Sequence, residues 1–94
     1  MVVMILETAP PSLRGELSRW LIEPHPGVFV GALSAMVRDR LWQRCCEKSK
    51  AGGVVQIWSS NTEQGFQMRM FGQTQREIAD YDGLLLVRWP AAVP

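Results

Sequence analysis

The chain has 94 residues, of which 47% are hydrophobic and 20% are charged, and its formal net charge is +1. This length allows one domain, residues 1–94, and the aromatic content excludes a disordered chain. No apolar run reaches the roughly 18–20 residues that a membrane span needs, so we expect no membrane partner. The hydrophobic fraction is high for so small a chain, which indicates that a second copy covers part of its apolar surface.

The first quarter of the chain predicts a strand followed by a helix. Residues 1–6 form a continuous apolar run, which is typical of a strand that is buried on both faces and therefore central in a sheet. Pro11 favours the start of a helix. Apolar residues then recur at helical spacing, namely Leu13, Leu17, Trp20 and Leu21. We expect this helix to continue until Pro24 ends it.

A second helix is predicted after a short strand. Residues 24–27 are expected to form a turn, and residues 28–30 a strand. Ser34 is a favourable N-cap residue, and a helix is predicted from there through Lys48. Its apolar face is expected to carry Val37, Leu41 and Cys45.

The second half of the chain predicts three strands, over residues 54–59, 66–71 and 84–89. The loop between the first two is short, so they are expected to pair as an antiparallel hairpin. Residues 66–71 alternate, with Phe66, Met68 and Met70 on one face and Gln67 and Arg69 on the other. Residues 72–83 are interpreted as a polar connection.

These elements predict an α+β two-layer sandwich with two helices on one mostly antiparallel sheet. The C-terminal strand is an addition to this unit. An apolar strand left on an open edge invites aggregation, so we expect it to be used in dimer or complex formation.

Two adjacent cysteines, Cys45 and Cys46, are the only ones in the chain. Neighbouring cysteines on a helix cannot form a disulfide without strain, and two cysteines provide no disulfide framework. We interpret them as free thiols of a cytoplasmic protein.

Glu7 is the candidate for chemistry, because it follows the central strand directly. A carboxylate at a strand end can hold a hydrated Mg²⁺, and a two-fold dimer would bring two copies of Glu7 together. The alternative is a solvated carboxylate near the positive end of the first helix.

Eight of the ten basic residues are arginines, a residue type that binds phosphate bidentately. Arg14 and Arg19 belong to the first predicted helix, and Arg76 to the late connection. The second helix carries Arg38, Arg40 and Arg44. They can form an ordinary solvated surface, or they can contact the phosphates of a duplex.

Short motifs follow one another along nearly the whole chain. They are Pro10-Pro11-x-Leu13-Arg14-Gly15, Gly27-Val28-Phe29-Val30-Gly31, Asn61-Thr62-Glu63-x-Gly65-Phe66 and Asp82-Gly83-Leu84. In this order and spacing, the chain resembles the type I-E branch of CRISPR-associated protein 2, the small subunit of the spacer-acquisition complex.

The resemblance implies a ferredoxin-like fold and a homodimer that joins two dimers of the CRISPR integrase. It also implies that the dimer supports a double-stranded DNA fragment by its backbone. Arg14 and Arg76 match basic positions of the family, with Arg19 and Arg38 as further candidates for DNA contact. Glu63 and Asp82 match acidic positions that dock the integrase.

Two other functions stay open. Many members of the family are labelled metal-dependent endonucleases of RNA or DNA, and their acidic residue at the end of the first strand corresponds here to Glu7. Glu7 is therefore the candidate catalytic residue and Mg²⁺ ligand. The fold alone is also compatible with a small-ligand or regulatory dimer unrelated to CRISPR.

Overall fold

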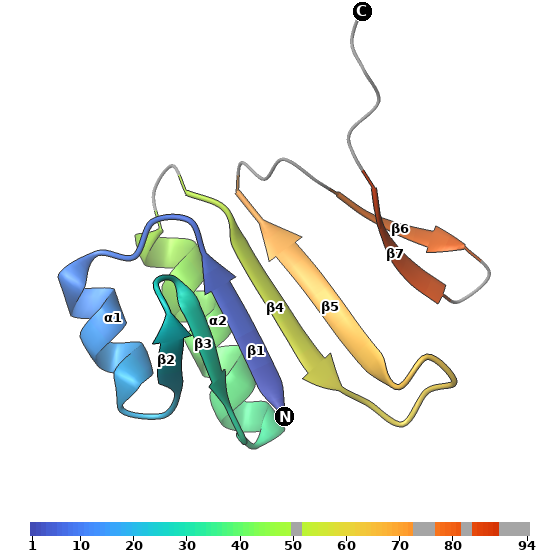
Figure 1. The fold of residues 1–94 in the computed structure, drawn as a ribbon, viewed down its shortest axis with the longest axis horizontal. Helices are drawn as coiled ribbons and strands as arrows, with labels where there is room; N and C mark the ends of the chain where they lie inside the picture. The colour runs from blue at the N-terminus through green and yellow to red at the C-terminus, as the bar shows by residue number, and fades with distance from the viewer. Residues whose placement is uncertain (50–51, 73–76, 82–83, 89–94) are drawn as a thin grey trace, which may run out of the picture.

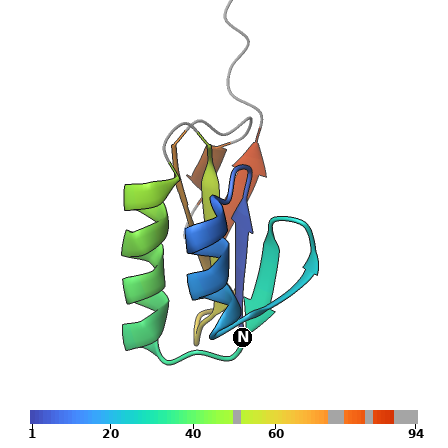
Figure 2. The same cartoon turned by 90° about the vertical axis from the view of Figure 1, so that its left-hand side faces the viewer.

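The computed structural model describes residues 1–49, 52–72, 77–81 and 84–88. Within them, helices α1 (Pro11–Ser18) and α2 (Ala35–Lys48) lie side by side on one face of a five-stranded antiparallel sheet (Figures 1 and 2). The sheet order is β2 (Ile22–His25), β3 (Val28–Gly31), β1 (Val2–Leu6), β4 (Val54–Ser59) and β5 (Phe66–Phe71). Strands β6 (Glu77–Tyr81) and β7 (Leu84–Arg88) form a separate antiparallel hairpin beside β5. The predicted α+β, ferredoxin-like sandwich is confirmed.

Strand β1 is the central strand, as its apolar run predicts. It pairs antiparallel with β3 on one side and with β4 on the other. The helices cover only one of its faces: Met4 is completely buried, whereas Ile5 on the opposite face is 38% exposed. The expectation that both faces are buried is therefore wrong within a single chain.

Helix α1 is shorter than its apolar spacing predicts. Leu13 and Leu17 are buried against the sheet, but the helix ends at Ser18 rather than near Pro24. The N–H groups of Trp20 and Leu21 both donate to the carbonyl oxygen of Leu17, which closes the last turn. The chain then leaves the helical path, so Trp20 lies outside the predicted apolar stripe and is 53% exposed.

Strand β2 occupies residues that were expected to end the helix and begin a turn. It contains Pro24, which an edge strand tolerates because the missing N–H faces no partner strand. Only Pro26 and Gly27 form the turn to β3, and Gly27 has a positive φ of 82°. A Cβ on Gly27 would approach the carbonyl oxygen of Leu6 to 2.5 Å, so this position requires glycine.

Helix α2 agrees with its prediction at both ends. The Ser34 hydroxyl accepts a hydrogen bond from the N–H of Val37 at 3.3 Å, which caps the helix. Leu41 and Cys45 are buried against the sheet. Burial raises the pKa of the Cys45 thiol to about 12, so this free cysteine is an inert part of the core. Neither helix of the described part is long and apolar enough to cross a membrane.

The C-terminal half contains one confirmed hairpin and one that the sequence did not predict. Strands β4 and β5 pair antiparallel across a short loop, as expected. Strand β6 lies within residues 72–83, so the interpretation of this segment as a polar connection is wrong. Gln64, in the β4–β5 loop, joins the two hairpins: its side-chain amide donates to the carbonyl oxygen of Leu85 at 2.6 Å and accepts from the Leu85 N–H at 2.7 Å.

Candidate nucleic-acid interface

Arg14 lies on α1 and remains 47% exposed. Its guanidinium is 3.4 Å from the carboxylate of Glu23 on β2. The same Glu23 oxygen accepts the N–H of Gly27 at 2.9 Å, so the carboxylate is itself fixed by the β2–β3 turn. Arg14 is therefore positioned by one neighbour while nearly half of its side chain faces solvent, an arrangement that suits contact with a phosphate.

Arg19 and Arg40 lie at the outer surface of the helical layer. Arg19 is the C-cap residue of α1, and Arg40 lies in the middle of α2. Both side chains are exposed, and neither forms an ion pair with another described residue. Among the described residues, Arg19 and Arg40 therefore remain without an ion-pair partner on this surface.

Arg44 and Lys48 are engaged with Glu16, which ties α2 to α1. Arg44 donates to both carboxylate oxygens of Glu16, at 2.6 and 3.0 Å, and Lys48 lies at 3.4 Å. The hydrogen bond from Arg44, with the nearby charges of Arg44 and Lys48, lowers the pKa of Glu16 to about 2. Glu16 thus stays ionised and neutralises part of the basic surface.

Arg38 is held in a stack between the helices and the sheet. Its guanidinium lies 4.4 Å from the ring centre of Trp58 and donates to Asp39 at 3.1 Å. Arg69 of β5 lies near the same ring at 4.9 Å and also donates to Asp39. These two donors lower the pKa of the Asp39 carboxyl. Arg38 is only 19% exposed, so it offers less surface to DNA than Arg14 does.

Gln56 provides hydrogen-bond partners in the interior of this stack. It is completely buried, donates to the backbone carbonyl oxygen of Arg38 at 3.0 Å, and accepts two hydrogen bonds from Arg69 at 2.6 and 2.8 Å. Arg69 also lies over Trp42 at 4.7 Å. The alternation of residues 66–71 predicts on which face of the strand Arg69 lies, but its partners lie far away in sequence.

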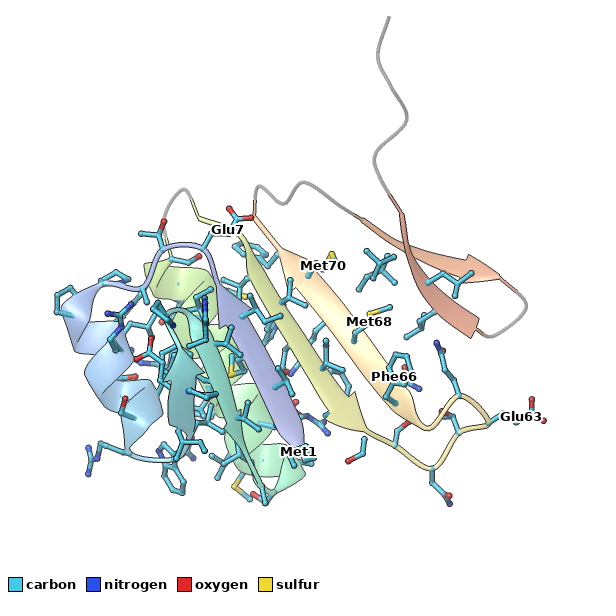
Figure 3. All side chains as sticks on the ribbon, viewed as in Figure 1. Met1, Glu7, Glu63, Phe66, Met68 and Met70 are labelled. Carbon is cyan, nitrogen blue, oxygen red and sulfur yellow. The ribbon has the colours of Figure 1, made fainter. Side chains whose placement is uncertain are left out.

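Glu7 extends from the end of β1 and is exposed (Figure 3). Its N–H donates to the carbonyl oxygen of Gly53, and its carboxylate accepts the Gly53 N–H at 3.4 Å. The described residues include no cluster of three His, Cys, Asp or Glu side chains that could hold a metal ion. Within the described part of the chain, Glu7 is therefore a carboxylate without further acidic ligands grouped around it, and one carboxylate does not by itself form a Mg²⁺ site.

Of the two acidic docking candidates, the structure describes only Glu63. Glu63 is exposed in the β4–β5 loop, at the opposite end of the sheet from Glu7 (Figure 3). Asp82 and the DNA-contact candidate Arg76 lie outside the described residues. No described feature other than its exposure singles out Glu63.

The face of the sheet opposite the helices is apolar across four strands. In the pairing register, Val30, Val3, Ile57 and Met68 form one row, and Val28, Ile5, Val55 and Met70 form the next. We call these eight residues the open face. All are at least partly exposed, and Figure 3 shows Phe66, Met68 and Met70 along the same side of β5. Such a surface is typical of a contact between proteins.

The fold and these surfaces define a small α+β sandwich with arginines on its helical layer and an apolar outer sheet face. The model of the family described as CRISPR-associated protein (Cas_Cas2CT1978) matches residues 1–86. The chain therefore belongs to this family of CRISPR-associated proteins. The assignment to the type I-E branch stays a prediction.

Proposed function

We propose that the protein is a CRISPR adaptation subunit: a homodimer that binds double-stranded DNA by its backbone and joins two integrase dimers during the acquisition of new spacers. Membership of the CRISPR-associated family supports the biological setting. The observation that carries the proposal is the open face, because it argues for a second copy of the chain.

Two apolar rows without a charge favour a two-fold contact. In a two-fold dimer the same patch meets itself, so a patch with charges of one sign would repel its copy. The open face has no charged residue in either row, and Ile5 at its centre is 38% exposed. Burial of these side chains would stabilise the dimer by roughly 25 cal/mol for each Å² of apolar surface removed from water.

The dimer would present every arginine of the helical layer twice. Arg14, Arg19, Arg38 and Arg76 are the proposed DNA contacts, and a two-fold pair of such surfaces matches the two strands of a duplex. Phosphate contacts carry no base information, so duplexes of unrelated sequence should bind with equal affinity. Glu63 and Asp82 are proposed to dock the integrase.

Ile57→Lys tests this proposal. Each dimer would then bury two like charges in its contact, so we expect the dimer dissociation constant to rise at least roughly 100-fold in sedimentation analysis. Met36→Lys is the matched control, because Met36 is 71% exposed on α2, on the other side of the sheet. Co-purification with the integrase should fail for Ile57→Lys alone. A dimer unchanged by Ile57→Lys would contradict the proposed contact.

A metal-dependent endonuclease is the competing function, supported by the exposed position of Glu7 at the end of the central strand. If the protein is a scaffold, Glu7→Ala leaves spacer integration by the whole complex near the wild-type rate. Cleavage by the isolated protein, measured with and without a chelator, should be lost in the same variant. Loss of integration with dimer and integrase binding intact would instead favour the nuclease.

A further inference from the structure

A pocket of about 240 Å³ opens between the end of α1 and the middle of α2. Its lining consists of Glu16, Arg19, Trp20, Arg40, Leu41 and Arg44. It lies on the helical layer, which Figure 2 shows on the opposite side of the sheet from the open face. A dimer formed through the open face would therefore leave the pocket accessible.

The charges of the lining are only partly balanced. Arg44 is bound to both oxygens of Glu16, and Lys48 adds a third contact to the same carboxylate. Glu16 therefore has little capacity left for Arg19 or Arg40. These two exposed guanidiniums have no acidic partner among the described residues, so the pocket attracts an anion.

Trp20 adds an aromatic surface beside the two cations. Its side chain is 53% exposed because α1 ends at Ser18 and the following turn carries Trp20 out of the core. Leu41, which is 3% exposed, provides the only aliphatic part of the lining. A half-exposed indole next to arginines is the combination that binds an unpaired base and its phosphate.

We propose that this pocket binds one unpaired nucleotide of single-stranded nucleic acid, with the base stacked on Trp20 and the phosphate between Arg19 and Arg40. A duplex cannot use the indole in this way, because its bases are stacked on one another. A pocket for a protein segment would need more apolar lining than Leu41 and Trp20 provide. The volume is below the roughly 300–1,000 Å³ of sites for whole drug-sized ligands, which agrees with a single ring rather than a longer segment.

This inference rests on the proposed function only in that the protein binds nucleic acid. The test uses fluorescence anisotropy with labelled dT8 and with a labelled 20-base-pair duplex. We expect Trp20→Ala to weaken dT8 binding roughly 5- to 100-fold and to change duplex binding less than about twofold. Trp20→Phe should retain most of the affinity for dT8, and Phe71→Ala is the matched control, because Phe71 is 48% exposed on β5.

The phosphate contact has its own readout. Replacing Arg19 and Arg40 together by alanine should lower the slope of log affinity for dT8 against log salt by about 0.7, which corresponds to loss of the one phosphate that the two arginines share. The double replacement by lysine keeps both charges and should leave the slope near the wild-type value.

The outcomes separate this inference from the proposed function. If the duplex binds but Trp20→Ala leaves dT8 binding unchanged, the pocket inference is overturned and the proposed function stands. If dT8 binds in a Trp20-dependent manner and the duplex does not bind, the pocket inference stands and the proposed duplex scaffold fails. Binding of an octaglutamate peptide with the same dependence on Trp20 would overturn the nucleotide assignment.

Discussion

The two faces of the sheet differ in a way that reverses the usual pattern. The face under the helices contains charged and polar side chains: Gln56 and Arg69 lie in the same row as the buried Met4. The open face carries only apolar residues in its two rows, yet all are at least partly exposed. In a sheet with one solvated face, the solvated face is normally the polar one.

This difference separates two kinds of stabilisation. On the covered face, the polar groups in the row of Met4 are tolerated because they are paired: Gln56 bonds to Arg38 and Arg69, and Arg69 bonds to Asp39. On the open face no partner is needed, because there is no polar side chain to satisfy in the two rows. The covered face therefore stabilises the single chain, and the open face is suited to association.

The largest expected effect is on the covered face. Phe29 is completely buried, and Phe29→Ala should lower the free energy of unfolding by about 3–5 kcal/mol through lost burial and the cavity left behind. Urea denaturation in an Ile57→Lys background measures the effect on the single chain. Met68→Ala on the open face is the comparison and should cost much less there. Equal losses would show that the two faces do not differ in this way.

An intermediate effect is expected for the polar group of the covered face. Gln56→Ala removes a side-chain donor to the Arg38 carbonyl oxygen and leaves Arg69, which is only partly exposed, without the acceptor of two of its hydrogen bonds. Unsatisfied buried groups cost about 1–3 kcal/mol each, so the free energy of unfolding should fall by an amount in this range. Gln43→Ala, at an exposed position of α2, is the control for loss of a glutamine. An unchanged free energy of unfolding in Gln56→Ala would show that these hydrogen bonds do not stabilise the fold.

The smallest expected effect is the pH dependence of stability. It should arise only from ion pairs on the helix-covered side of the sheet. Because the pKa of Glu16 is lowered to about 2 in the folded chain, its ion pairs stabilise the fold above pH 4.5. This contribution is lost as the pH falls from 4.5 towards 2. Since Glu16 is partly exposed, solvent screens the effect. The unfolding free energy of Glu16→Gln, measured at several pH values, should lack this pH-dependent contribution. The Asp39→Asn variant separates it from the contribution of Asp39, the other carboxyl whose pKa is lowered. An acid profile unchanged in Glu16→Gln would exclude the ion pair as its source.

Local patterns in the sequence were sufficient for the elements that pack by periodicity. The apolar run of β1, the Ser34 cap of α2 and the alternation of residues 66–71 each predicted an observed element. Strands β2 and β6 were missed because neither has a local strand pattern: β2 contains Pro24, and β6 forms by pairing with β7. Their conformation depends on a partner strand, which periodicity does not report.

The candidate site was predicted less completely than the fold. The sequence identified Arg14, Arg19 and Arg38 as basic helix residues but not which of them are engaged. Arg38 stacks on Trp58, which is twenty residues away, and only the packing of α2 on β4 brings them together. The helical spacing places Trp20 on the apolar stripe of the first helix, but that helix ends at Ser18. A contact between distant elements leaves no signal in a single sequence, whereas a spacing does.

The contact between Gln64 and Leu85 has a mechanical consequence. A glutamine amide carries one carbonyl and one N–H-bearing group, as a peptide unit does, and here it binds both backbone groups of Leu85 as a neighbouring strand would. The β4–β5 loop and the β6–β7 hairpin are therefore coupled at this point. A force applied to the loop that carries Glu63 is transmitted to β7 through these two hydrogen bonds. The β4–β5 loop and the β6–β7 hairpin should therefore move together when a partner binds to either of them.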